Sequence, residues 1–419
     1  MGGVSMEWKV FSLSDIAHYS QGKQIPLNLQ YLELNELRER FIRIVDFTSN
    51  WSQEPRFVDK DPKYLVNIDD IVMIRYGTPG KVFRGHKGII ANNLFKITFN
   101  EEIIDKDYAY WYLNQDSVYK QLMAGQSSST MPAITFGMLK YIMVRVPPIS
   151  YQRRIASILS SLDRKIELNN KINADLEEMA QAIFKNWFVD FEPFKDGKFV
   201  DSELGMIPEG WKVGSYSEMI DSLISGDWGK EKPQGNYTHE VACVRGCDFQ
   251  DINNGVRGKT PQRYILEKNY QAKHLKDKDI LVEISGGTAT VSTGRTSLVT
   301  EELLKKYNHD IVCTNFCKVL RPLSQFSSYV YYSWKYKYDN DIMFGYENGT
   351  SGIKNFAIKD FIEKEPVLIP KEQDIVEFQK IIDNLQKQKQ IKGTENTTLS
   401  LLRDTLLPRL MSGELEVPE

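Results

Sequence analysis

The chain has 419 residues, of which 41% are hydrophobic and 26% charged, and its formal net charge is -3. This is the balance of an ordinary globular protein with room for two or three domains. No segment of the chain carries the large positive charge of a polybasic arm. An anionic partner would therefore have to bind a local patch of charge. No apolar run approaches the roughly 18 residues that span a bilayer, and no apolar signal core opens the chain, so we expect a cytoplasmic protein without membrane contact.

The first part of the chain opens with the phrase WKVFSLSDI at residues 8–16. Short runs rich in β-branched residues follow, namely DIVMIRY (70–76), LFKITF (94–99) and YIMVRV (141–146). Turns and short helical stretches separate them, which is typical of short strands in a mixed fold. We therefore interpret residues 1–150 as one mixed domain of the α+β class.

A long helical pattern follows at residues 151–190. From Ile155 onward its apolar residues recur mostly three and four positions apart, as in a coiled-coil seam. A helix of this length extends roughly 55 Å, which exceeds the width of a small domain. It therefore needs a partner along its length.

Residues 191–370 form a linker and a second domain that repeats the first. The linker is rich in Pro and Gly, and the phrase WKVGSYSEM at 211–219 then matches residues 8–16. Further matches keep their order while the offset grows from 203 to 222 residues: DILVE (279–283) with DIVMI (70–74), NFCKV (315–319) with NLFKI (93–97), and YVYYS (329–333) with YAYWY (108–112). Ordered matches of this kind predict a tandem repeat of a globular domain followed by a helix.

The second helix is expected at residues 371–419, with the same apolar stripe as the first. We expect the two helices to pack on each other as an antiparallel coiled coil, which would give the chain a pseudo-twofold internal repeat. The alternative is that each helix only covers the core of its own domain. Because Gly is unfavourable inside a helix, Gly393 predicts a break or kink. The expected pairing residues are Leu159, Leu162, Ile166, Met179, Ile183, Ile382, Leu385, Leu402 and Leu406.

The four cysteines form two C-x3-C pairs, Cys243 with Cys247 and Cys313 with Cys317, which is a spacing that zinc sites can use. Their neighbours are apolar and β-branched, as in strands. The repeat also places all four opposite apolar residues of the first domain: Phe41, Val45, Ala91 and Phe95. We therefore expect buried core cysteines and no metal.

Motifs for catalysis are missing from the sequence. It contains no phosphate loop, no dinucleotide turn, no H-E-x-x-H helix and no [ND]-P-P-[YF] element of an adenine methyltransferase. Its five histidines stand singly. A catalytic triad assembled only in three dimensions stays open, but we expect neither a cofactor nor catalysis.

Polar, Gly-rich loops remain as candidates for recognition: residues 75–88 and 124–130 in the first domain, 285–295 and 347–355 in the second. Arg and Lys can read guanine edges or phosphates, Ser and Thr reach either, and Gly lets the backbone approach closely. The candidate DNA-binding residues are Arg75, Tyr76, Lys81, Arg84, Lys87, Ser127, Ser128, Thr130, Arg245, Ser285, Thr288, Arg295, Asn348, Thr350, Ser351 and Lys354.

Several phrases of the chain resemble the specificity subunits of type I restriction-modification systems. They are WKVFSLSDI, VPPISYQRRIASILSSLDRKIELN, AIFKNWFVDFEP, SELGMIPEGWKV and LRDTLLPRLMSGELEV, which together extend over essentially the whole sequence. The resemblance implies two target-recognition domains, at 1–150 and 191–370, alternating with two paired spacer helices at 151–190 and 371–419.

The same resemblance implies the function and the partners. Each domain would read one half of a bipartite, asymmetric site in double-stranded DNA. The paired helices would set the spacer and dock two methyltransferase subunits, and restriction subunits would join through the methyltransferase. A non-catalytic scaffold, a specificity subunit of a methyltransferase-only complex and a stand-alone enzyme remain as alternatives.

Overall fold

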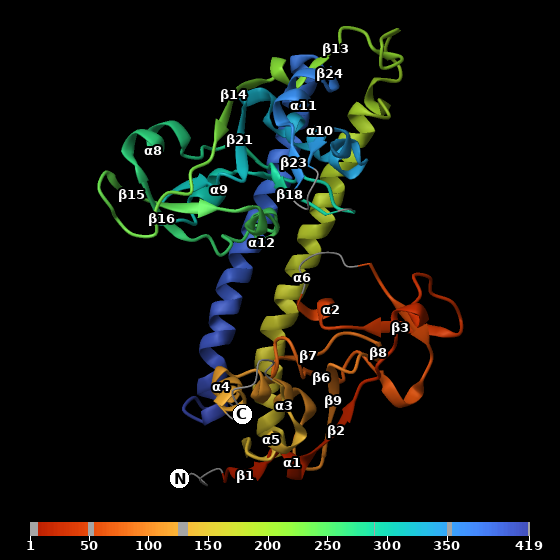
Figure 1. Ribbon diagram of the computed structural model, residues 1–419, viewed down its shortest axis with the longest axis vertical. Coiled ribbons are helices and arrows are strands. Elements are labelled where there is room, and N and C mark those ends of the chain that lie inside the picture. Colours follow the sequence, from red (N-terminus) through yellow and green to blue (C-terminus); the bar gives the residue numbers. More distant parts are fainter. Residues whose placement is uncertain (1–6, 49–53, 125–132, 289, 350–353, 418–419) are drawn as a thin grey trace. The chain divides into compact units, whose positions relative to one another are not determined.

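The computed structural model describes residues 7–48, 54–124, 133–288, 290–349 and 354–417 (Figure 1). Its internal contacts divide the chain into two compact units. Unit 1 contains residues 1–165 and 399–419, and unit 2 contains residues 166–398. Each unit therefore holds one globular part together with one end of each long helix.

Unit 1 contains a four-stranded antiparallel sheet in the order β2–β9–β6–β7. Its strands are β2 (Ala17–Gln21), β9 (Leu94–Phe99), β6 (Ile71–Ile74) and β7 (Val82–Phe83). A second sheet has the order β4–β3–β8–β5, with β4 (Phe57–Asp59), β3 (Arg38–Ile42), β8 (Gly88–Ile90) and β5 (Leu65–Val66). A separate ladder pairs β1 (Lys9–Ser12) with β10 (Met143–Val146). The helices of this globular part are α1 (Leu13–Ile16), α2 (Val45–Thr48), α3 (Lys106–Leu113), α4 (Asp116–Ala124) and α5 (Phe136–Leu139).

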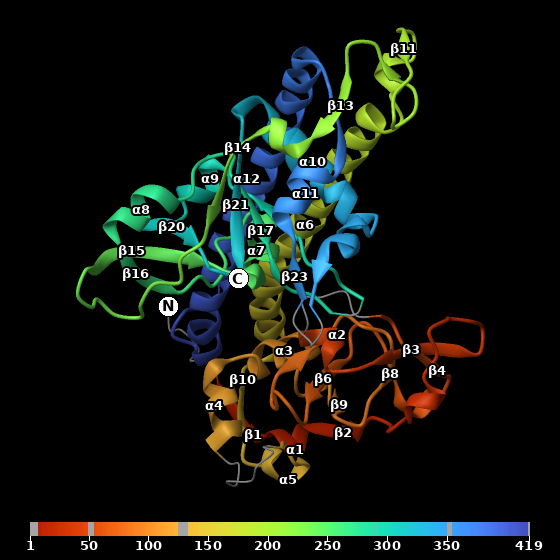
Figure 2. The same ribbon diagram turned by 45° about the horizontal axis from the view of Figure 1, so that its top comes forward.

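Unit 2 repeats the four-stranded sheet and the two-stranded ladder, whereas its second sheet has three strands. Its four-stranded sheet has the order β14–β21–β17–β19, with β14 (Ile220–Ser225), β21 (Cys317–Pro322), β17 (Ile280–Glu283) and β19 (Thr296–Leu298). The second sheet, β16 (Gln262–Leu266), β15 (Tyr237–Val244) and β20 (Asp310–Cys313), lies beside α8 (Glu267–Lys273) (Figure 2). A ladder again pairs β13 (Lys212–Ser215) with β24 (Pro366–Ile369).

The remaining elements of unit 2 are short, apart from α10 (Ser327–Asp339). They are β11 (Phe199–Val200), β12 (Ile207–Pro208), α7 (Phe249–Asn253), β18 (Ser285–Gly286), α9 (Glu301–Leu304), β22 (Glu347–Asn348), β23 (Lys354–Phe356) and α11 (Ile358–Lys364). The short strands form a three-stranded sheet in the order β18–β23–β22.

The predicted repeat is confirmed down to individual side chains. In unit 1, the hydroxyl of Tyr108 on α3 donates to the carbonyl of Arg145 on β10 at 2.7 Å. In unit 2, the matching hydroxyl of Tyr329 on α10 donates to the carbonyl of Leu368 on β24 at 2.5 Å. Both phenols are buried, so each needs such a partner. Equivalent tyrosines therefore connect equivalent helices to equivalent ladders in the two units.

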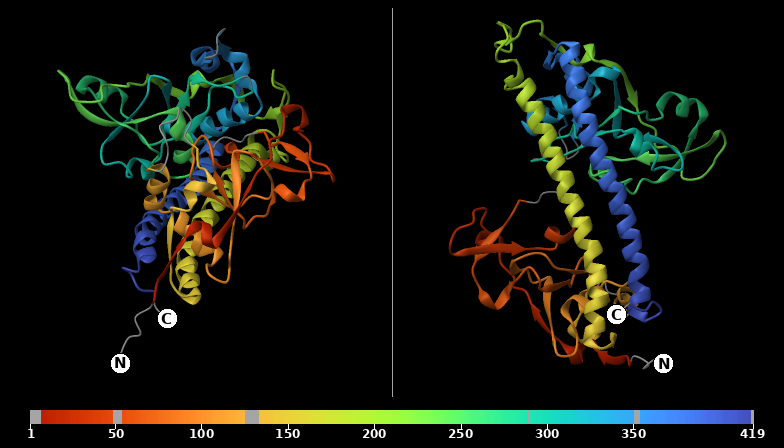
Figure 3. Two further views of the ribbon diagram at one scale, coloured as in Figure 1. Left: turned by 60° about the horizontal axis from the view of Figure 1, so that its bottom comes forward. Right: turned by 180° about the vertical axis from the view of Figure 1, so that it is seen from behind.

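The two long helices are α6 (Ile149–Phe188, 40 residues) and α12 (Glu372–Ser412, 41 residues) (Figure 3). In unit 1, Arg403 of α12 forms an ion pair with Asp163 of α6 at 2.6 Å, and Val417 beyond α12 donates to Tyr151. As the residue number on α6 rises from 151 to 163, the number of the contacting residue at the C-terminal end of the chain falls from 417 to 403. Within this unit the helices are therefore antiparallel, as predicted.

The helices run antiparallel within unit 2 as well. Asn169 donates to Asn396 at 2.9 Å, and Asn173, four residues on, donates to the carbonyl of Lys389 at 3.3 Å. These contacts lie on the mutually facing sides of α6 and α12. Here too the partner on α12 moves down the chain as α6 moves up.

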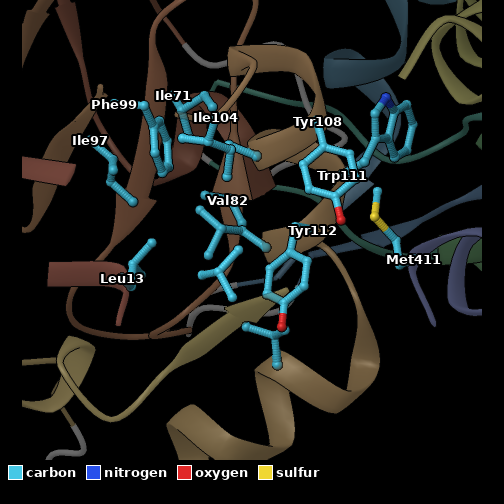
Figure 4. Packing of buried hydrophobic residues seen from close by; sticks show 14 of the residues in the cluster. Leu13, Ile71, Val82, Ile97, Phe99, Ile104, Tyr108, Trp111, Tyr112 and Met411 are labelled. Carbon is cyan, nitrogen blue, oxygen red and sulfur yellow. The ribbon is translucent and has the colours of Figure 1, made fainter. Parts of the chain in front are cut away.

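The helices also contribute to the core of each unit. The apolar stripe therefore serves both predicted roles, namely helix pairing and covering of the domain core. In unit 1, Leu159 of α6 belongs to the same buried cluster as Met411 of α12. Figure 4 shows Met411 in this cluster with Tyr108, Trp111 and Tyr112 of α3. In unit 2, the buried apolar residues of both helices join one cluster; they are Ala180, Phe184, Phe188, Ile375, Phe378 and Ile382. The helices pair with each other and cover the domain cores with the same apolar face.

The seam between the helices is more polar than the apolar stripe indicated. Ile183, Leu385 and Leu406 pack against the domain cores, and Leu162 and Ile166 are half-buried. However, Met179 is 51% exposed and Leu402 is 45% exposed, so these two lie off the buried face. Polar residues take much of the buried space instead: Asn169, Asn173, Gln386, Lys389, Gln390 and Asn396.

The break expected at Gly393 is absent, so that prediction was wrong. α12 is helical through this position, and Gly393 is buried against the turn after α7. A Cβ built on Gly393 would lie 2.0 Å from the carbonyl oxygen of Gly255. The glycine therefore permits close packing against the helix instead of interrupting it.

Lys306 fixes the same turn to α12. Its ammonium donates to the carbonyl of Gly255 and, at 2.7 Å, to the side-chain oxygen of Gln390. Burial lowers the pKa of Lys306 to about 8. The folded chain therefore loses this proton at a lower pH than the unfolded chain does.

The stability of the chain is expected to rise between pH 8 and pH 10 relative to that of a Lys306→Met variant. Because the folded pKa lies below the unfolded value of about 10.4, this contribution is complete above the unfolded pKa and is lost as the pH falls through about 8. Denaturant unfolding of both proteins across this range measures the difference. Parallel curves would contradict it.

Candidate nucleic-acid interface

In each unit, the backbone brings the two candidate loops together. Tyr76 and Ala133 form an antiparallel bridge in unit 1, and the amide of Ile134 donates to the carbonyl of Arg75 at 3.0 Å. In unit 2, β18 pairs with β23 through Ser285 and Asn355. The repeat thus places the same pairing of loop ends in both units. Ser127, Ser128, Thr130, Thr350 and Ser351 lie outside the described residues.

The first loop of each pair is closed by the same two hydrogen bonds. In unit 1, the amide of Ile74 donates to the carbonyl of Lys81 at 2.9 Å, and that of Gly80 donates back to Ile74 at 2.8 Å. In unit 2, the amide of Glu283 donates to Arg295, and that of Gly294 donates back to Glu283, both at 2.9 Å. Lys81 and Arg295 therefore occupy equivalent positions. Gly80 and Gly294 both adopt positive φ, of 85° and 93°, which favours glycine.

The cations of the unit 1 loop differ in how they are held. Lys81 and Lys87 are exposed. Arg84 forms an ion pair with Asp107, and its guanidinium lies 4.2 Å from the centre of the Tyr110 ring. Arg75 is half-buried beside the ring of Tyr76. Lys81 and Lys87 are therefore the candidates with the greatest freedom to reach an anion.

The cations of the unit 2 loops are paired with carboxylates. Arg295 makes two hydrogen bonds of 2.8 Å to Glu283, and Lys354 contacts Glu347 at 2.7 Å. The hydroxyl of Ser285 donates to the side-chain oxygen of Asn355. Thr288 and Asn348 are exposed. Unit 2 thus presents a polar surface whose two cations are already neutralised.

The sequence of the chain is similar to those of known proteins. Residues 6–178 match the family described as the type I restriction modification DNA specificity domain. The chain is 27% identical over 341 residues to the type I restriction enzyme MjaIX specificity subunit of Methanocaldococcus jannaschii, covering 79% of this chain and 74% of that protein. It is 25% identical over 393 residues to the HindI specificity subunit of Haemophilus influenzae, covering 78% and 81%. Over most of its length the chain is similar to the specificity subunits of type I restriction-modification systems.

A solved structure shares the fold of this chain. The S subunit of a type I restriction-modification system from M. genitalium superposes with a TM-score of 0.54 at 16% sequence identity, covering 98% of this chain and 97% of that one. At this level of identity the likeness concerns the fold alone.

Arg245 stabilises a turn of unit 2. Its side chain and its amide both bind Asp248, whose side chain is 3% exposed, and its guanidinium also donates to the carbonyl of Lys259. Arg43 and Asp46 form the same arrangement in unit 1. A pair present in both units fixes a turn that the two units share. The repeated spacing of Arg and Asp was the sequence signal for it.

Three of the four cysteines lie in the core of unit 2, as expected. Cys243, Cys313 and Cys317 are buried, and burial raises the pKa of Cys243 and of Cys317 to about 12. The expectation was wrong for Cys247, which is exposed because it lies in the tight turn after β15 and not in a strand. Across the part of the chain that the structure describes, no three His, Cys, Asp or Glu residues are grouped so as to hold a metal ion.

Glu283 and Glu347 were missed by the sequence analysis, although both hold candidate loops in place. Single carboxylates carry no motif, and their partners Arg295 and Lys354 were assigned to DNA. No helix among the described residues is long and apolar enough to cross a membrane.

Proposed function

We propose that each unit of the chain reads one half of a bipartite, asymmetric site in double-stranded DNA. The proposal is supported by loops that are closed in the same way in both units but differ in their residues. The same hydrogen bonds close residues 75–80 in unit 1 and residues 284–294 in unit 2, yet the loops differ in length and charge. Unequal loops on equal scaffolds suit the reading of unequal half-sites.

In this proposal the chain performs no catalysis itself. Methyltransferase subunits, two per chain, dock on the paired helices and supply the chemistry, and restriction subunits join through them. The helices also set the number of unread base pairs between the half-sites, because α6 and α12 are continuous helices of 40 and 41 residues, about 60 Å each. The polar seam supports this role, since buried polar pairs specify register in helix pairs.

The test is to assemble the chain with its methyltransferase subunits and map the methylated positions on random-sequence DNA. The expected result is a split consensus, with two specific half-sites separated by a fixed number of unread base pairs. A single continuous consensus, or methylation without sequence preference, would contradict the proposal.

Replacing Lys81 by alanine is expected to weaken DNA binding about equally for all sequences. An exposed lysine contacts phosphate more readily than it reads a base, so the slope of log K against log salt should fall by about one. Titrations at several salt concentrations measure both quantities. The matched control is Lys9→Ala, which removes an exposed lysine from β1, away from the loops. A loss of affinity confined to one sequence would show that Lys81 reads a base.

A further inference from the structure

The loop between β17 and β19 in unit 2, residues 285–295, is anchored at its base by Glu283. This carboxylate belongs to a residue only 9% exposed and accepts both hydrogen bonds from the guanidinium of Arg295. Two parallel hydrogen bonds to a planar guanidinium fix its orientation as well as its position. The last residue of the loop therefore has a single defined side-chain geometry.

A second carboxylate, Glu347 of β22, holds the loop from the side. It is 6% exposed and accepts from the amide of Thr293 at 2.6 Å, from the hydroxyl of Thr293 at 2.9 Å and from Lys354 at 2.7 Å. Burial alone would raise the pKa of Glu347, but these donors outweigh it and lower the pKa. The carboxylate is therefore charged and saturated with protein donors.

Aromatic side chains fix the rest of the loop stem. The indole of Trp334 donates to the carbonyl of Gly294 at 2.9 Å, and the hydroxyl of Tyr338 donates to the carbonyl of Ser292 at 3.2 Å. By contrast, Thr288 and Thr290 near the tip are exposed. A rigid stem that carries an exposed tip is the arrangement expected of a preorganised binding loop.

Unit 1 lacks the carboxylate at the base of its loop. The position equivalent to Glu283 is Ile74, and the equivalent of Arg295 is Lys81. The carboxylates of unit 2 also offset the positive charges of Arg295 and Lys354, which reduces their general attraction for phosphate. The anchored loop of unit 2 is thus built for selectivity more than for affinity.

Building on the proposed function, we propose that Glu283 and Glu347 are positioning residues that determine which base pairs unit 2 accepts. They act through the 285–295 loop, which they hold in one conformation against the bases of one half-site. Weakening either anchor lets the loop sample several conformations, so base discrimination at that half-site falls while the other half-site is read as before.

The experiment compares the wild-type chain with Glu283→Gln and Glu347→Gln, each assembled with the methyltransferase subunits, on duplexes randomised in both half-sites. Each variant removes a charge and keeps the side-chain shape. Discrimination at one or more base pairs is expected to fall about tenfold. Both variants must relax the same half-site, with the other half-site read as before. Glu301→Gln, which changes an exposed carboxylate paired with Lys305, is the matched control.

Thr293→Val provides a milder variant that folds without losing a buried charge. It removes the hydroxyl donor to Glu347 and leaves the amide donor in place, so the same half-site should relax to a smaller degree. An unchanged consensus in all three variants would overturn the inference, as would equal relaxation of both half-sites. If the wild-type complex itself shows no split consensus, the proposed function fails first.

Discussion

Replacing Glu177 by alanine is expected to destabilise unit 2 by about 3–5 kcal/mol. Glu177 of α6 accepts hydrogen bonds from Lys389 of α12 and, at 2.7 Å, from Lys335 of α10. The side chain of Lys389 is only 4% exposed. Without its partner this ammonium would stay buried and uncompensated, which costs far more than the loss of a surface ion pair. Denaturant unfolding followed by circular dichroism measures the change.

Two further variants separate the buried charge from the lost contact. Asp190→Ala removes the partner of the exposed Lys185 and should cost less than about 1 kcal/mol. The double replacement Glu177→Leu with Lys389→Met removes both charges between α6 and α12, so it should be less damaging than Glu177→Ala alone. A double variant that is less stable than the single variant would show that the ion pair itself contributes most of the stability.

The contribution of Glu177 also depends on pH with a defined sign. Burial would raise the pKa of Glu177, but the charges of Lys389 and Lys335 outweigh it and hold the pKa well below its usual value of 4.5. A carboxyl group with a lowered folded pKa stabilises the fold above its unfolded pKa and loses that effect as the pH falls. The difference in stability between the chain and Glu177→Gln should therefore shrink below about pH 4.5.

The architecture of the chain was accessible from the sequence because it is repeated. Ordered matches such as Tyr108 with Tyr329 exposed the tandem domains, and the apolar spacing predicted both long helices. The seam between the helices was less accessible. Glu177 and Lys389 are 212 residues apart, and each looks like an ordinary solvated residue of a helix. Only the packed structure shows that these two charges meet in the interior.

The candidate DNA-binding loops were likewise predictable from the sequence only in part. The sequence identified the candidate loops, whereas the pairing of their ends, Tyr76 with Ala133 and Ser285 with Asn355, is seen only in the structure. Residue type alone did not separate a cation that reaches solvent from one bound to a carboxylate. Arg245 was assigned to DNA on its charge, whereas its geometry depends on Asp248 three residues later. Local partners decide such cases, and they are fixed by turn conformation.

Replacing Gly393 by alanine is expected to destabilise unit 2 by about 2–3 kcal/mol, although alanine is the better helix former. The added Cβ would meet three backbone atoms of the turn after α7: the carbonyl oxygen of Gly255 at 2.0 Å, its carbon at 2.2 Å and the oxygen of Asn254 at 2.6 Å. Backbone atoms cannot rotate away as side chains do. The turn would have to move off α12, which would also break the hydrogen bond from Lys306 to Gly255.

The matched control for Gly393→Ala is Thr398→Ala, because Thr398 lies in the same helix and is exposed. There the alanine meets no neighbouring backbone, so its helix propensity should prevail and stabilise the chain by about 0.5 kcal/mol. The two substitutions are therefore expected to change the free energy of unfolding in opposite directions. If Gly393→Ala were also stabilising, the turn after α7 could not be packed against α12, and the glycine would be the helix weakness that its sequence position indicated.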